Sequence, residues 1–106
     1  MGLFDFLKRP DLERGLAQFS RTPGAVLLDV RTPEEFAAGH IPESQNIPLH
    51  MLGQAGQLPD SLETPLFVYC QSGVRSRQAV ESLRRAGYSH VTDLGGICHY
   101  HGKVVK

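Results

Sequence analysis

Cys70 is the residue of this sequence best placed to do chemistry, because of the loop that follows it. Positions 70–76 read Cys-Gln-Ser-Gly-Val-Arg-Ser and come directly before a stretch with helical spacing. The first turn of a helix leaves backbone N–H groups unpaired and carries a partial positive charge. Gly73 lets the backbone bend around an anion, and Arg75 adds a cation. We therefore expect Cys70 to be largely thiolate near neutral pH and to act as a nucleophile.

An alternative interpretation of Cys70 involves no chemistry. A free cysteine is often a small apolar residue that ends a buried strand. Gly73, Arg75 and the helix after them favour the nucleophile, because they would stabilise both the thiolate and the anionic group that it attacks.

A buried strand and an amphipathic helix are expected to hold this loop. Residues 66–69, Leu-Phe-Val-Tyr, form a short apolar run after Pro65, which is typical of a fully buried strand. From about Val74, apolar residues recur at helical spacing until Gly87, a glycine typical of a helix end. The thiol would then lie at the carboxyl end of a strand.

A second buried strand is predicted over residues 25–30, with Asp29 near its carboxyl end. In open α/β sheets, ligands gather at the carboxyl ends of strands, so Asp29 and Cys70 are expected at the same edge. A buried carboxylate needs partners, and a structural role, accepting hydrogen bonds from loop amides, is favoured over acid–base catalysis. Thr32 then caps a short helix with Pro33 at its first position.

The rest of the pattern predicts a single α/β domain over residues 1–106. Gly95 and Gly96 permit a close backbone approach or a positive φ. Strands that alternate with helices indicate a central, mostly parallel sheet of about five short strands, with helices on both faces. The other expected elements are a helix over residues 11–19, short strands near Ile47 and over 90–94, and an N-terminal extension or first strand over 1–10.

Composition and charge argue against several classes of protein. The 106 residues carry 11 Lys and Arg and 11 Asp and Glu, a formal net charge of zero that does not suit a nucleic-acid-binding surface. No run approaches the length of a transmembrane helix, and the start does not resemble a secretory signal. The two cysteines do not suggest a disulfide framework. We therefore expect a cytoplasmic protein with no nucleic-acid or membrane partner.

Taken together, the motifs resemble the rhodanese-like domain over nearly the whole chain, from about residue 11 to residue 100. They are Leu-Asp-Val-Arg-Thr-Pro-Glu-Glu-Phe at 28–36 with Gly-His-Ile-Pro at 39–42 and Asn-Ile-Pro at 46–48, the loop at 70–76, and Leu-Gly-Gly at 94–96. Two positions depart from the family pattern. Glu43 stands where a small residue, commonly glycine, is usual, and Tyr100 stands where many members carry tryptophan.

The resemblance implies a sulfurtransferase built on a parallel sheet flanked by helices. Cys70 would take a sulfane sulfur from a small donor such as thiosulfate, become a persulfide, and pass the sulfur to cyanide, a thiol or a thioredoxin-like protein. Arg75 would bind the donor's sulfonate or shape the loop, and Asp29 and Arg31 would support the loop. No metal or organic cofactor is required. The residues whose backbone would bind donor and persulfide are Gln71, Ser72, Gly73, Val74, Arg75 and Ser76.

Two other functions remain open for such a fold. Phosphatases and arsenate reductases that share this fold have an active-site loop that resembles the pattern Cys-x5-Arg. The arginine of that loop donates to two oxygens of a tetrahedral anion. Cys70 and Arg75 form the shorter Cys-x4-Arg, which favours sulfur over phosphate. The other alternative is a rhodanese-like binding or redox-sensing module with weak turnover, although such modules often lack the cysteine that this chain has.

Cys98, in the run Ile-Cys-His-Tyr-His, has three interpretations. It is a partly buried thiol beside surface histidines, a resolving thiol that forms a disulfide with Cys70, or a metal ligand together with His99 and His101. The first is favoured, because three ligands this close in sequence rarely bind one tetrahedral ion. We therefore predict no metal site.

Overall fold

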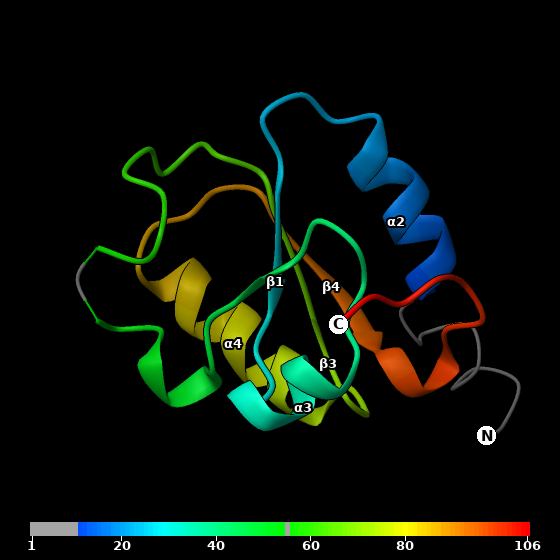
Figure 1. Cartoon of the computed structure of the whole chain (residues 1–106). Coiled ribbons are helices and arrows are strands. Elements are labelled where there is room, and N and C mark those ends of the chain that lie inside the picture. The colour runs from blue at the N-terminus through cyan, green and yellow to red at the C-terminus, as the bar shows by residue number, and fades with distance from the viewer. Residues whose placement is uncertain (1–10, 55) are drawn as a thin grey trace, which may run out of the picture.

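A computed structural model describes residues 11–54 and 56–106 of the chain. The sheet is parallel and has the strand order β2-β1-β3-β4 (Figure 1). Its strands are β1 Val26–Asp29, β2 Gln45–Asn46, β3 Leu66–Cys70 and β4 Val91–Gly96. The helices are α2 Leu12–Ser20, α3 Pro33–Ala38 and α4 Val74–Arg85, with the 3-10 turns η1 Leu49–Met51 and η2 Ile97–His99. Within these described ranges, no helix has the length and apolar character needed to span a membrane.

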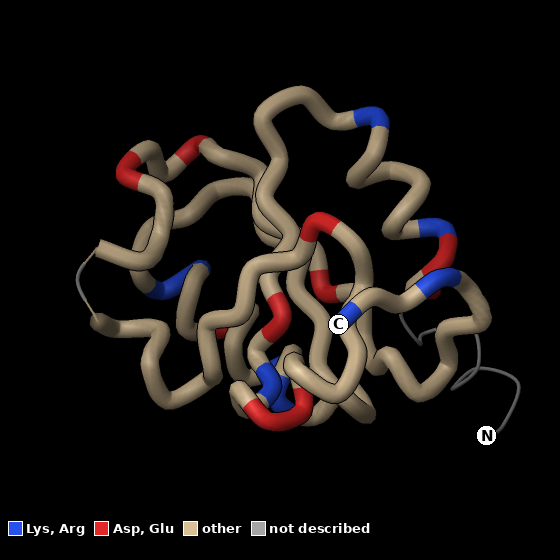
Figure 2. Tube along the Cα trace, in the orientation of Figure 1, with Lys and Arg blue, Asp and Glu red and all other residues tan. Residues whose placement is uncertain are grey.

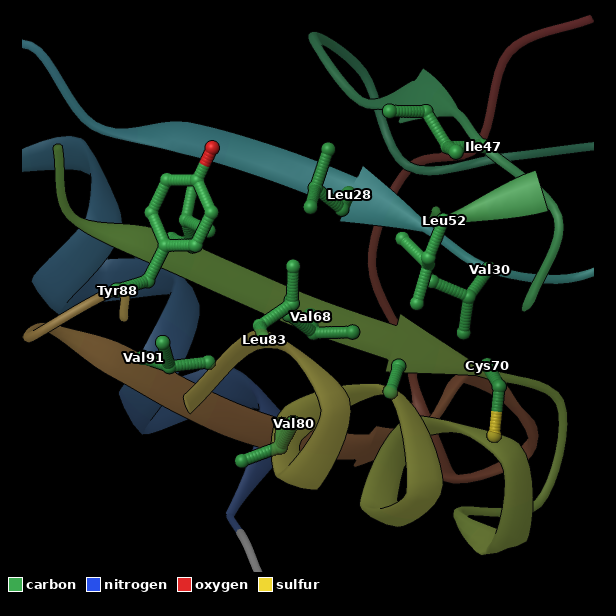
Figure 3. Close-up of a cluster of buried hydrophobic side chains, with 12 residues drawn as sticks. Leu28, Val30, Ile47, Leu52, Val68, Cys70, Val80, Leu83, Tyr88 and Val91 are labelled. Carbon is green, nitrogen blue, oxygen red and sulfur yellow. The ribbon is translucent and has the colours of Figure 1, made fainter. Parts of the chain in front are cut away.

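Helices cover both faces of the sheet, as the sequence predicts (Figure 1). The side chains of β3 are all buried and alternate between two apolar clusters, because successive residues of a strand point to opposite faces. Phe67 and Tyr69 pack on the face covered by α2. Val68 and Cys70 pack on the face covered by α4 (Figure 3). The alternation therefore turns the Cys70 side chain toward α4.

The prediction of about five strands is wrong for the described residues, where the sheet has four. β2 consists of two polar residues and ends just before Ile47, the residue predicted to lie on it. So short a strand leaves no alternating pattern to recognise. The strand predicted over 90–94 lies at 91–96 and includes both glycines. Residues 1–10, predicted as an extension or a first strand, lie outside the described residues.

α3 begins at a cap that the sequence predicts. The Thr32 hydroxyl accepts the N–H of Glu35 at 3.1 Å, and the Glu35 carboxylate accepts the N–H of Thr32 at 2.9 Å, which completes a capping box. Pro33 at the first helical position has no N–H to leave unpaired. The cap fixes where the Glu35 side chain starts, and this side chain takes part in the site described below.

Glu43 has a φ of 74° and is the one non-glycine residue with a positive φ in the described part of the chain. It occupies the third position of the turn over residues 41–44, after Pro42. The N–H of Ser44 closes this turn on the carbonyl of Ile41 at 3.1 Å. A turn with proline second and a positive φ third is the kind that favours glycine at the third position.

Replacing Glu43 with glycine is expected to raise the free energy of unfolding by about 1 kcal/mol. The left-handed backbone costs an ordinary residue about 1–2 kcal/mol, and the greater freedom of glycine in the unfolded chain takes back part of the gain. Urea denaturation measures the change. Glu63→Gly, in an exposed loop without a positive φ, is the control and is expected to lower stability. A Glu43→Gly variant less stable than the parent would contradict the argument.

Candidate active site

Cys70 ends β3, and its sulfur points toward the first turn of α4 (Figure 3). The sulfur accepts the N–H of Gly73 at 3.0 Å and the N–H of Ser76 at 3.2 Å. Two backbone donors that converge on one sulfur stabilise negative charge on it. In the same turn, the N–H groups of Val74 and Arg75 have no hydrogen-bond partner among the described residues. The start of α4 therefore keeps further donors for a group bound to the sulfur.

The loop itself lies at the surface, whereas the sulfur is buried beneath it. Cys70 has no exposed area, but the next two residues are exposed and Val74 is 62% exposed. Gly73 turns the chain from strand into helix with a φ of 106°, a conformation that suits glycine. Of the loop residues predicted from the sequence, the structure thus places the N–H groups of Gly73 and Ser76 on the Cys70 sulfur.

The backbone of β4 packs closely against the loop at its two glycines, Gly95 and Gly96. Gly96 lies beside Cys70 in the pairing of β3 with β4. A Cβ at Gly96 would lie 2.6 Å from the carbonyl oxygen of Gln71 and 2.7 Å from the carbonyl carbon of Ser72. Gly95 has a φ of 83°. The close approach and the positive φ predicted for this pair are therefore both confirmed, one at each glycine.

Asp93 also contacts the loop, although it stands outside the motifs recognised in the sequence. One of its carboxylate oxygens lies 2.8 Å from the Ser76 hydroxyl and accepts the N–H of Gly95 at 2.9 Å. The pairing of β3 with β4 shifts register at this point, and such irregularities re-aim side chains. Because the N–H of Ser76 donates to the Cys70 sulfur, Asp93 helps to fix that donor. The following pair of glycines was the only local signal.

Asp29 and Arg31 form a buried ion pair at the end of β1. The Asp29 carboxylate has no exposed area and accepts the backbone N–H of Arg31 at 2.9 Å and its Nη2 at 2.7 Å. Burial alone would lower the pKa of the Arg31 guanidinium, but the hydrogen bonds and charge of Asp29 raise it. Arg31 also donates to the carbonyl of Gly39 at 2.7 Å and to the side chain of Gln71 at 3.2 Å. The pair thus links β1 to the loop.

Arg75 is forked onto Glu35 of α3. Nη1 lies 2.7 Å from one carboxylate oxygen and Nη2 lies 3.0 Å from the other, and about a third of each side chain is exposed. Hydrogen bonds from Arg75 lower the pKa of Glu35 to about 2, and those same bonds raise the pKa of Arg75. Figure 2 shows acidic and basic segments meeting where α3 begins. The sequence did not reveal this pair, because 40 positions separate its members.

The pair makes stability depend on pH in the acid range. Glu35 titrates near pH 2 in the folded chain and near its ordinary value of 4.5 in the unfolded chain. Its contribution is therefore complete above about pH 4.5 and is lost as the pH falls through about 2. Since both partners are partly exposed, we expect about 1 kcal/mol at most.

Urea denaturation of the parent and of Glu35→Gln at pH 7 and pH 2.5 measures this effect. The difference in the free energy of unfolding between the parent and Glu35→Gln is expected to be smaller at pH 2.5 than at pH 7. Glu34→Gln, which removes a neighbouring carboxylate with no ion partner among the described residues, separates loss of the pair from loss of one charge. A difference that stays constant over this interval argues against a stabilising pair.

Cys98 lies in η2, beside the loop, where its backbone N–H donates to the carbonyl of Gln71 at 3.1 Å. Its thiol is free and exposed, which corrects the expectation of partial burial. Within residues 11–54 and 56–106 there is no group of three or more His, Cys, Asp or Glu placed to hold a metal ion. The metal interpretation with His99 and His101 therefore finds no support there, and the resolving role stays a prediction.

Comparison with known proteins agrees with the arrangement of these motifs. A family model described as the rhodanese-like domain matches residues 13–101. The chain is 41% identical over 81 residues to the uncharacterized protein YqhL of Bacillus subtilis, covering 76% of this chain and 64% of that protein. It is 40% identical over 72 residues to the thiosulfate sulfurtransferase PspE of Escherichia coli, covering 66% of this chain and 68% of that protein.

The fold agrees with a solved structure as well. The rhodanese with anions from E. coli superposes with a TM-score of 0.70 at 32% identity, covering 77% of this chain and 98% of that one. The match of the family model over most of the chain, with the relatives and the fold, makes the assignment plain: the chain belongs to the rhodanese-like domain family.

Proposed function

We propose that this protein is a sulfurtransferase that carries a sulfane sulfur on Cys70. The observation that supports this most is the sulfur of Cys70 held by the N–H groups of Gly73 and Ser76 at a helix start. A relative at 40% identity bears the name thiosulfate sulfurtransferase. Thiosulfate is therefore the donor with which to begin.

In the first step, the Cys70 thiolate attacks the outer sulfur of thiosulfate. A bond forms between the two sulfur atoms as the sulfur–sulfur bond of the donor breaks, and sulfite leaves with the electron pair. The product is a persulfide anion on Cys70. The N–H groups of Val74 and Arg75, which have no hydrogen-bond partner among the described residues, would donate to the added sulfur, which carries the charge.

In the second step, a thiophilic acceptor attacks the outer sulfur and the Cys70 thiolate leaves. Cyanide, a small thiol or a thioredoxin-like protein would serve, and the exposure of the loop on its outer side supports access for such groups. The two free thiols suit a reducing compartment, and we propose the cytoplasm. The chain's own residues suffice for both steps.

The geometry favours sulfur transfer over phosphatase chemistry. A phosphatase loop needs its arginine aimed at the oxygens of a phosphate. Here the fork of Arg75 is occupied by Glu35, and the spacing from Cys70 is one residue short of the phosphatase pattern. A binding or redox-sensing module remains the second candidate, favoured only by the exposed second thiol of Cys98 beside the loop.

Intact-mass measurement after incubation with thiosulfate tests the proposal. We expect the reduced protein to gain one sulfur atom, to keep it on the peptide that contains Cys70, and to lose it to cyanide or a thiol. Cys98→Ser is expected to charge like the parent, and Cys70→Ser is expected not to charge. No gain from thiosulfate or from a thiosulfonate in a folded, reduced sample would count against the proposal and favour the binding module.

A further inference from the structure

Two arginines near the sulfur site are each paired with a carboxylate. Arg31 is paired with Asp29, and Arg75 is paired with Glu35 through both ends of its fork. Asp93 adds a carboxylate on the other side of the loop, where it lies against the Ser76 hydroxyl. Thiosulfate carries two negative charges, so a site of this kind attracts it less than one with a free arginine would.

Glu35 is the carboxylate that most directly controls the charge presented to a donor. The exposed third of Arg75 places its guanidinium at the surface beside the loop, whereas Arg31 is buried. Arg75 lies in the first turn of α4, between Gly73 and Ser76, whose N–H groups contact the Cys70 sulfur. End-on pairing with Glu35 occupies both Nη atoms, which are the groups that would otherwise fork onto a sulfonate.

We propose that Glu35 is a specificity-determining residue that neutralises Arg75 and so sets a preference for donors of low charge over doubly charged thiosulfate. This inference rests on the proposed sulfur transfer through Cys70. The class of donor that it favours carries the sulfane sulfur on a group with a single negative charge, such as a thiosulfonate or a small thiol persulfide. With such donors the Cys70 thiolate again attacks the outer sulfur as the sulfur–sulfur bond of the donor breaks. A thiosulfonate then releases a sulfinate, and a thiol persulfide releases a thiolate, in place of sulfite.

A pair of donors that differ in charge tests this. Thiosulfate is a dianion and methanethiosulfonate is a monoanion, and both deliver one sulfane sulfur. Glu35→Gln keeps the oxygen that caps Thr32 but removes the charge that neutralises Arg75. Since electrostatic energy is proportional to the charge on the donor, a gain of about threefold in kcat/KM for the monoanion corresponds to a gain of about tenfold for the dianion.

The rate of charging of Cys70 at subsaturating donor, followed by intact mass, is the readout. We expect Glu35→Gln to raise kcat/KM, to raise it more for thiosulfate than for methanethiosulfonate, and to lose this gain as salt is raised. Glu34→Gln, in the same turn of α3 but with no ion pair among the described residues, is expected to charge like the parent. Adding Arg75→Gln to Glu35→Gln is expected to cancel the gain.

The results separate the inference from the proposed function on which it rests. Equal gains for the two donors, or none, would overturn the inference while Cys70 still charges. A loss with both donors would also overturn it, because Glu35 would then be holding Arg75 in a donor-binding position. If neither donor charges Cys70 in any of these proteins, the proposed function fails and the inference fails with it.

Discussion

Replacing Gly96 with alanine is expected to reduce the charging of Cys70 by a factor on the order of 100, because a shift of about 1 Å in a reacting group has that effect. The new Cβ would lie 2.6 Å and 2.7 Å from backbone atoms of Gln71 and Ser72. No rotation of a side chain relieves a contact with backbone, so the loop itself must move. We also expect a loss of about 1–3 kcal/mol in the free energy of unfolding, as for other overpacked sites.

Two other glycines of the chain provide matched controls. A Cβ at Gly53 meets nothing within 4 Å, so Gly53→Ala is expected to leave both quantities near those of the parent. A Cβ at Gly15 would collide with the side chain of Leu94, which packs in the apolar cluster on the α2 face of the sheet, so Gly15→Ala is expected to lower stability while Cys70 still charges. Intact mass and urea denaturation give the two readouts. A folded Gly96→Ala protein that charges at the parental rate would refute this account of the loop.

Replacing Asp29 with asparagine is expected to lower the free energy of unfolding by about 3–5 kcal/mol. The side chain of Arg31 is only 5% exposed, and Asp29 is the one charged partner it has in the described part of the chain. Asparagine keeps the shape but leaves the guanidinium buried without a counter-charge. Since small domains are stable by about 5–15 kcal/mol, the loss is a large share of the total.

A double replacement distinguishes the charge from the shape. Removing both charges, in Asp29→Leu with Arg31→Met, is expected to cost less than Asp29→Asn alone, because no uncompensated charge stays in the core. Asp60→Asn, at an exposed loop position, is the control and is expected to change stability by less than about 0.5 kcal/mol. Urea denaturation of the four proteins measures these differences. A loss in Asp29→Asn as small as that of the control would show that the pair is dispensable.

Features that depend on neighbouring residues could be predicted from the sequence. A few adjacent residues are enough to predict each of three features: the cap of α3 at Thr32, the strand that ends at Cys70 and the helix after Gly73. The paired glycines at 95–96 were predicted to allow a close approach because glycine alone lacks a Cβ. Local steric and hydrogen-bonding rules therefore carried the prediction of the loop.

Features that depend on distant residues could not be predicted in this way. Glu35 meets Arg75 across 40 positions, and Asp93 meets Ser76 across 17. A single sequence holds no signal for such contacts. An acidic residue that pairs with a distant residue looks the same in the sequence as an acidic residue on an ordinary polar surface. The two-residue strand β2 was predicted at Ile47, one residue beyond its end, for a different reason: its pairing with β1 comes from register in the sheet, and its polar residues show no alternation.

A chain that is still being synthesised contains Cys70 before it contains β4. The strand and helix over residues 66–85 bring the nucleophile and its two amide donors, but Gly96 and the amide of Cys98 follow later. Parallel strands need a long crossover between them, and here α4 is that crossover. A chain that ends before residue 96 therefore contains the nucleophile without the backbone support of its binding loop.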